Sequence, residues 1–168
     1  MQETGWIVSV NVSAGGVPKT PLPAGDMLEQ HGLSQDRQAF EKHRKPKRAL
    51  SLLSVELLNQ FQAEGFKVGP GTMAENLTVY GVDLNSLKPG ARITFDSGAS
   101  VEVSEQRRPC YQLNPMGEGL EKAAMGRSGV LCSVLATGQL KPGMSFVVDR
   151  SQERNEPAKA QAQPTSAN

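Results

Sequence analysis

The sequence predicts an α+β fold that is mostly β, a barrel or sandwich of short strands with a few short helices. Short apolar runs bounded by turn residues recur at intervals of about 8–12 residues, which is typical of such folds. Only two segments carry a helical pattern, whereas a parallel α/β sheet would alternate strands with helices. The chain has 168 residues, of which 38% are hydrophobic, so it is long enough for one core and one domain.

Several runs have the pattern of strands. In residues 6–12, alternate apolar side chains fall on one face at period two, namely Trp6, Val8, Val10 and Val12. The later runs are residues 48–53, 77–79, 93–95, 101–103 and 130–136. Asp96, Ser97 and Gly98 predict a hairpin that joins the middle pair.

A helix is predicted directly after the second run. The Ser54 hydroxyl can cap its first turn, and Gly65 is suited to end it. Its apolar side chains lie on one side, and they are Leu57, Leu58 and Phe61. A second, shorter helix is predicted at residues 120–125.

The phrase Leu-Lys-Pro-Gly occurs at residues 87–90 and again at 140–143, each time before alternating apolar residues. Proline followed by glycine suits the central positions of a type II turn. Two strands entered through the same turn explain this recurrence, so we predict no internal repeat.

The end of the chain has a different composition. Beyond Val148 there is no Ile, Leu, Val, Met or aromatic residue, so this segment cannot offset the entropy of ordering. We therefore expect one domain over residues 1–148 and a disordered tail over residues 149–168.

Charge and segment composition exclude several classes of partner. Eighteen Lys and Arg against 17 Asp and Glu leave a net charge of +1, so no overall field favours nucleic acid or an anionic membrane. The basic run at residues 43–48 lacks interleaved aromatic residues. No signal peptide or membrane span is visible, so we expect a cytoplasmic protein with no nucleic-acid and no membrane partner. His31 and His43 show no zinc spacing.

Cys110 is the candidate reactive residue. It follows Arg107 and Arg108 at the end of a predicted strand, and neighbouring cations lower the pKa of a thiol. The resulting thiolate is both a nucleophile and a soft metal ligand. A cysteine also packs well as a small hydrophobe, so from the pattern alone both interpretations stay open. Cys132 lies in an apolar run and is assigned to the core.

Taken in order, several phrases resemble the MOSC family, named after the C-terminal domain of molybdenum cofactor sulfurases. The phrases are residues 10–13 and 16–19, Asp36-Arg37, residues 48–50, Pro70-Gly71 with residues 75–78, Arg107 with Pro109-Cys110, and Gly126-Arg127 with Gly129-Val130. The family commonly has His-Gly-Gly-Pro before its Arg-Ala, where this chain has residues 43–47 before Arg48-Ala49. It also commonly has glycine before its Glu-Asn-Leu, where this chain has Ala74. The resemblance implies a MOSC-type β-barrel and a family cysteine that matches Cys110.

The resemblance also implies what Cys110 does. In the function we favour, Cys110 is both the catalytic residue and the metal ligand of a bound molybdenum cofactor (molybdopterin). This cofactor supports reduction of a small-molecule N-hydroxylated substrate with electrons from a redox partner protein. The residues expected to hold the cofactor are Lys19, Arg37, Arg48, Arg107 and Arg127 for the phosphate, and Asn76 and Thr78 for the pterin.

Two alternatives remain. In the first, Cys110 is a sulfur carrier that receives a persulfide, for instance from a cysteine desulfurase, and passes it to another thiolate. In the second, the chain is a non-enzymatic cofactor-binding module in which Cys110 is dispensable. Longer relatives carry a pyridoxal-phosphate desulfurase domain, for which this chain is too short, so no pyridoxal phosphate is expected.

Overall fold

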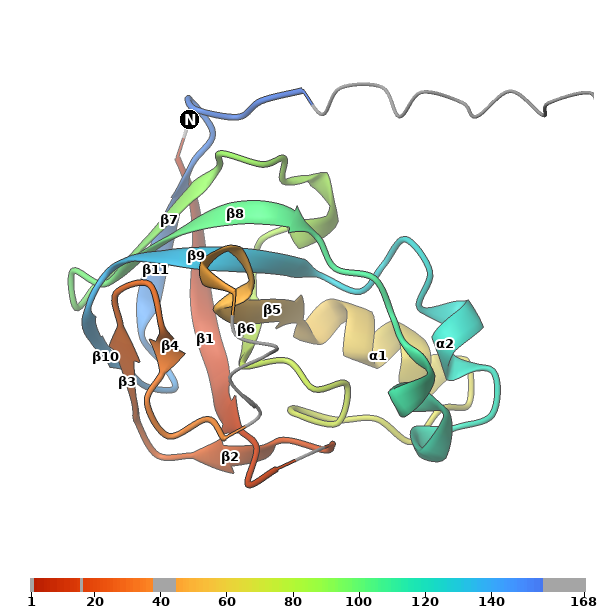
Figure 1. Ribbon diagram of the computed structural model, residues 1–168. Coiled ribbons are helices and arrows are strands. Elements are labelled where there is room, and N and C mark those ends of the chain that lie inside the picture. Colours follow the sequence, from red (N-terminus) through yellow and green to blue (C-terminus); the bar gives the residue numbers. More distant parts are fainter. Residues whose placement is uncertain (1, 16, 38–44, 156–168) are drawn as a thin grey trace, which may run out of the picture.

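The computed structural model describes residues 2–15, 17–37 and 45–155 and shows a closed seven-stranded barrel (Figure 1). Around the barrel the strands are β11 (Ser145–Asp149), β7 (Arg92–Phe95), β8 (Ser100–Gln106), β9 (Val130–Ala136), β5 (Leu50–Ser54), β6 (Leu77–Tyr80) and β1 (Glu3–Val12). Pairing of β11 with β1 closes the barrel. Neighbouring strands are antiparallel except β5 and β6, which are parallel. The predicted mostly-β fold is confirmed.

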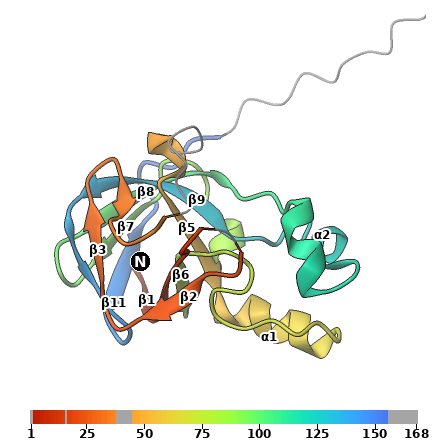
Figure 2. The same ribbon diagram turned by 60° about the horizontal axis from the view of Figure 1, so that its bottom comes forward.

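Smaller elements surround the barrel. Strand β2 (Thr20–Leu22) extends the sheet beside β1, and a separate sheet has the order β10 (Gly138–Leu140), β3 (Gly25–Leu28) and β4 (Gly32–Leu33). Short 3-10 helices cover Pro46–Arg48, Leu84–Ser86 and Tyr111–Met116. Helices α1 (Val55–Ala63) and α2 (Leu120–Ala123) lie together to one side of the barrel (Figures 1 and 2). Within the described residues, no helix is both long and apolar enough to span a membrane.

The inner face of β1 differs from the predicted one. Trp6 and Val8 are exposed, whereas Val10 and Val12 are buried. The register between β1 and β6 shifts between Ile7 and Ser9, which is the signature of a β-bulge. One extra residue in a strand reverses which side chains point inward beyond it. The strand was correctly predicted, but its single apolar face was not.

The prediction for α1 is confirmed in detail. The Ser54 hydroxyl accepts a hydrogen bond from Leu57 N at 3.3 Å, as an N-cap residue does. The predicted apolar side enters a second hydrophobic cluster outside the barrel, which also contains Leu113 and Leu120. This cluster fixes α1, α2 and the Tyr111–Met116 3-10 helix against one another. The second helix is shorter than predicted and ends at Ala123.

Both Pro-Gly phrases form the turns predicted for them. Ala91 N donates to Lys88 O, and Met144 N donates to Lys141 O, which closes each four-residue turn. Gly90 and Gly143 have φ values of 99° and 85°, which a type II turn requires at its third position.

Two boundaries differ from the predictions. Arg48 lies in a 3-10 helix that begins at Pro46, so strand β5 starts only at Leu50. Asp149 ends β11, and residues 150–155 of the predicted tail return to the barrel through ion pairs from Arg150 and Arg154. Charged contacts, rather than apolar burial, hold this segment. Residues 156–168 lie outside the described part of the chain.

Candidate functional site

Loops from distant parts of the sequence meet where β1 ends and β6 begins. Backbone hydrogen bonds join them: Asn11 N to Asn76 O, Lys19 N to Gly71 O, Arg37 N to Ser13 O and Arg107 N to Gly129 O, at 2.7–2.9 Å. The barrel thereby gathers several predicted site residues around one buried polar network. We call this network, together with the adjoining Arg107, the barrel-end cluster, and its side chains are Asn11, Lys19, Asp36, Glu75, Asn76, Thr78 and Arg107.

Lys19 and Asp36 form an ion pair in this cluster. Lys19 Nζ lies 2.8 Å from Asp36 Oδ2, and their side chains are only 2% and 14% exposed. Burial lowers the pKa of Lys19, against the opposing attraction of Asp36. Burial alone would raise the pKa of Asp36, but the charge and hydrogen bond of Lys19 bring it below its usual value. The positive charge of Lys19 is therefore already compensated inside the protein.

Asn76 and Thr78 are buried and bonded to the chain itself. Asn76 Nδ2 donates to Asp36 Oδ2 at 2.8 Å, and Asn76 Oδ1 accepts from Ser51 N at 3.1 Å. Thr78 Oγ1 receives a hydrogen bond from Asn11 Nδ2 at 3.1 Å. Asn76 and Thr78, the residues predicted to contact the pterin, thereby link β1, β5 and β6 to one another and to the loop that carries Asp36.

Glu75 is fully buried beside these residues. Its Oε1 accepts hydrogen bonds from Gly71 N at 2.6 Å and from Thr78 Oγ1 at 2.8 Å. Its Oε2 is also buried and has no partner among the described residues. Burial raises the pKa of Glu75, against those hydrogen bonds and the attraction of Arg107.

The loop that carries Glu75 has an unusual backbone. Gly71 has a φ of 84°, and a Cβ atom there would collide with the carbonyl oxygen of Lys19. Ala74 has a φ of 62°, in the left-handed region that glycine adopts more easily. This conformation gives a physical reason for the glycine that the family commonly has at this position.

Arg107 and Cys110 lie on the segment that leaves β8. Arg107 Nη2 donates to Met73 O at 2.6 Å, while its Nη1 is covered and has no partner among the described residues. Burial lowers the pKa of Arg107, against the attraction of Glu75 and Cys110. Cys110 is exposed at the start of the Tyr111–Met116 turn. The segment thus presents a thiol to solvent with a largely covered cation close by.

The other predicted cations are placed differently. Arg37 is exposed, next to Asp36 in sequence. Arg48 pairs with Glu105 at 2.6 Å on the outside of the barrel. Arg127 forms two hydrogen bonds with Glu64, both 2.6 Å, and its guanidinium lies 4.5 Å from the centre of the Phe61 ring. The structure therefore brings Lys19, Arg107, Asn76 and Thr78 together, whereas Arg48 and Arg127 have acidic partners elsewhere.

Sequence reasoning left several cluster members out of the candidate site. Asp36, Asn11 and Glu75 all occur within the phrases that resemble the family, but they are not among the candidate site residues that the sequence predicts. A signal for Asn11 is visible in retrospect, since it is a polar residue between two valines in a strand. Cys132 is buried in the core as predicted, and burial raises the pKa of its thiol.

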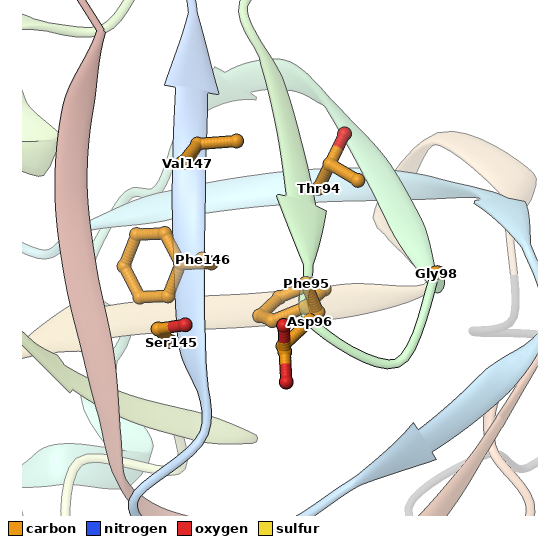
Figure 3. Close-up of a pocket in the computed structure, with 7 residues that line it drawn as sticks. All are labelled: Thr94, Phe95, Asp96, Gly98, Ser145, Phe146 and Val147. Atoms are coloured by element: carbon orange, nitrogen blue, oxygen red, sulfur yellow. The ribbon is translucent and has the colours of Figure 1, made fainter.

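Two other features do not form a reactive site. Among residues 2–15, 17–37 and 45–155, no group of three or more His, Cys, Asp or Glu side chains is placed to hold a metal ion. A shallow hollow lies between β7 and β11, lined by Phe95, Phe146 and their neighbours (Figure 3). Its one charged lining residue is Asp96, and it contains no thiol and no cation.

Comparison with known proteins gives the family. A family model described as the MOSC domain matches residues 39–147, which is more than half of the chain. The chain belongs to the MOSC domain family. The matched region includes Glu75, Arg107 and Cys110, whereas Lys19 and Asp36 precede it.

Individual relatives of this MOSC protein are distant. YuaD of Bacillus subtilis (strain 168), provisionally described as a metal-sulfur cluster biosynthesis protein, is 29% identical over 125 residues. This match covers 64% of each chain, so it spans less than two thirds of YuaD. The crystal structure of Bacillus subtilis YuaD superposes with a TM-score of 0.78 at 22% identity, covering 90% of this chain and 99% of YuaD. YiiM from Geobacillus stearothermophilus superposes with a TM-score of 0.71 at 24% identity, covering 86% and 75%. These structures share the fold.

Proposed function

We propose that this MOSC protein binds the molybdenum cofactor, with Cys110 as the thiolate ligand of the metal, and supports reduction of N-hydroxylated compounds. The observation that carries the proposal is the exposed Cys110 thiol close to Arg107 at the barrel-end cluster. A cytoplasmic location, where thiols stay reduced, is part of the same proposal.

The donor set fits a metal that arrives with its own organic ligand. A bare ion needs several protein ligands, and the described residues offer no such group. A metal that the pterin already holds through sulfur needs one further soft ligand, which the exposed Cys110 can supply. The unpartnered Nη1 of Arg107 is a donor for an anionic group, provided that the side chain turns to uncover it.

The residues of this chain have distinct roles in the proposal. Cys110 holds the metal, and Arg37 and Arg107 bind the negative charge of the cofactor. Lys19, Asn76 and Thr78 complete the cofactor-binding set at the barrel end, where their internal hydrogen bonds fix the loops. Arg48 and Arg127 join this set only by releasing Glu105 and Glu64.

When bound, the cofactor supplies a centre that accepts and donates electrons at the substrate. Reduction of an N–OH group to N–H consumes two electrons and two protons and releases water. In this proposal the electrons come from a separate redox protein. The exposed position of Cys110 leaves that face open to substrate and donor.

A sulfur-carrier function is the second candidate. The exposed Cys110 is accessible to another protein's thiol or persulfide, and the description of YuaD refers to metal-sulfur cluster biosynthesis. In this case a desulfurase supplies the sulfur, and Cys110 passes it on from its persulfide by attack of an acceptor thiolate.

Elemental analysis distinguishes the candidates. The protein is purified without oxygen from a host that makes the cofactor, and molybdenum is measured in the wild type, in Cys110→Ala and in Cys132→Ala. Near-stoichiometric molybdenum that is lost only in Cys110→Ala supports the proposal. Molybdenum retained in Cys110→Ala indicates a cofactor-binding module without thiolate ligation. Absence of molybdenum from the wild type refutes the proposal, and a persulfide on Cys110 then supports the sulfur carrier.

A further inference from the structure

Glu75 differs from the other acid of the barrel-end cluster because no cation pairs with it. It is fully buried, and the ion pairs within 4.0 Å that are seen among the described residues do not include it. Gly71 N and Thr78 Oγ1 both donate to Oε1, which leaves Oε2 buried without a partner. An ionised carboxylate with no paired cation and one unsatisfied oxygen is strongly unfavourable at such a position. This geometry favours the uncharged acid.

Two cations face Glu75 from neighbouring loops. Lys19 is already paired with Asp36 at 2.8 Å. Arg107 donates to the carbonyl oxygen of Met73, and its Nη1 is buried without a partner. If Glu75 loses its proton, Arg107 is therefore the cation whose charge is still uncompensated.

We propose that the charge state of Glu75 decides whether Arg107 can bind an anion. While Glu75 is uncharged, the guanidinium is an uncompensated cation beside the exposed Cys110 segment and takes an oxyanion such as a sulfate or phosphate group. When Glu75 is ionised, its carboxylate draws the guanidinium inward from the Met73 carbonyl. Glu75 is then a positioning residue, which acts through Arg107 and does not touch the ligand.

This coupling is reciprocal. If ionisation of Glu75 weakens oxyanion binding tenfold, then a bound oxyanion must raise the pKa of Glu75 by one unit. Asp36, Lys19 and Cys110 are the other groups in the site that can change charge. Asp36 has its pKa held low by Lys19, so it stays ionised across the neutral range. Replacing Cys110 by serine removes the thiol. Lys19, whose pKa burial lowers, is retained together with Asp36 when Glu75→Gln is added, so a pH dependence that comes from Lys19 persists in that variant.

The test uses the metal-free chain with Cys110→Ser, and sulfate is the probe because it does not titrate between about pH 5 and pH 9. Sulfate affinity is measured at constant ionic strength from the Arg107 Nε–H resonance, and Glu75 is followed by its side-chain carboxyl ¹³C resonance. The same measurements are made after adding Glu75→Gln, which keeps an acceptor oxygen for Gly71 and Thr78. Glu118→Gln removes an exposed carboxylate and is the matched control.

We expect sulfate affinity to fall about tenfold as Glu75 ionises, in Cys110→Ser and in the Glu118→Gln control, and to stay constant with Glu75→Gln. Sulfate should also raise the midpoint of the Glu75 titration by about one pH unit. The proposal is overturned if Glu75 titrates in the ordinary range of glutamate, if sulfate does not perturb Arg107 at any pH, or if Glu75→Gln leaves the pH dependence unchanged. The ¹³C titration in the chain that retains Glu75 decides the first point even if Glu75→Gln does not fold. Because no metal is present, none of these results bears on the molybdenum test.

Discussion

Asp36→Asn should lower the free energy of unfolding much more than replacement of its partner, Lys19, does. The two side chains form a 2.8 Å ion pair, and the lysine is almost completely buried. Asparagine leaves the ammonium group without a compensating charge, and breaking a buried pair from one side costs about 3–5 kcal/mol. For Asp36→Asn we expect a loss of about 3 kcal/mol, at the lower end of this range, because Asp36 is itself partly exposed.

Lys19→Met has a smaller expected cost. Asp36 keeps the hydrogen bonds from Ser13 N at 2.9 Å and from Asn76 Nδ2 at 2.8 Å, so its charge is still solvated by donors. Methionine also fills most of the volume of the lysine stem. We expect the free energy of unfolding to fall by about 1–2 kcal/mol, which is the size of a lost charge-assisted hydrogen bond. No uncompensated charge is left buried in this variant.

The pH dependence gives an independent check on the same pair. The pKa of Asp36 is lower in the folded state, so its stabilisation is present above its unfolded value of about 3.9 and is lost as pH falls through the folded value. Asp36→Asn should remove this loss of stability at acid pH. In that variant the pKa of Lys19 falls further, so the unfolded state binds more protons than the folded state and stability should rise as pH increases above neutrality.

Urea unfolding of the wild type, the two single variants and the double variant measures these energies and their coupling. The double variant Lys19→Met with Asp36→Asn should be more stable than Asp36→Asn alone, because the buried charge is gone. If Asp36→Asn costs less than 1 kcal/mol, or no more than Lys19→Met, the pair does not compensate a buried charge and the reasoning is refuted.

Three further variants and one control variant test the backbone and the helices by urea unfolding. Ala74→Gly should raise stability by up to about 1 kcal/mol, because it relieves a left-handed conformation; a loss would show that this conformation is not strained. Gly71→Ala should cost more than about 1 kcal/mol, because φ is positive and a Cβ atom has no room, whereas Gly69→Ala has open space and should be nearly neutral. Equal effects at both glycines would contradict the steric argument. Arg127→Ala should cost about 1–2 kcal/mol and less at high salt, because it loses both bonds to Glu64 and a cation–π contact; a salt-independent loss would argue against the ion pair.

Local pattern was sufficient for the longer elements of the fold. The α1 helix carries its cap, its apolar side and its terminal glycine within twelve residues of sequence, so Ser54, Phe61 and Gly65 could be assigned without the structure. The bulge in β1 could not, because it arises from how β1 pairs with β6. Strands β2, β4 and β10 have only two or three residues, which is too short for any periodicity to show.

In the candidate site, too, local sequence predicts some features and not others. Cys110 and Arg107 are three positions apart, so a cation beside a thiol could be predicted from the sequence. The partners of the other cations could not be predicted, because each acid lies far along the chain. Asp36 is 17 residues from Lys19, and Glu64 is 63 residues from Arg127. Local charge patterns show that a cation is present but not which acid neutralises it.

The distribution of charge in the barrel-end cluster then gives the physical reason for the roles proposed for Arg107 and Cys110. Lys19 is balanced by Asp36, and the burial of Glu75 favours its uncharged form, so neither supplies charge to a ligand. Arg107 is left with one carbonyl partner, on a segment that also carries the exposed Cys110 thiol and the exposed Arg108. A ligand that combines an anionic group with a metal that a thiolate can coordinate satisfies Arg107 and Cys110 at once. A ligand with only one of these features leaves either a buried cation or the thiol unused, which is the physical reason to measure molybdenum and oxyanion binding separately.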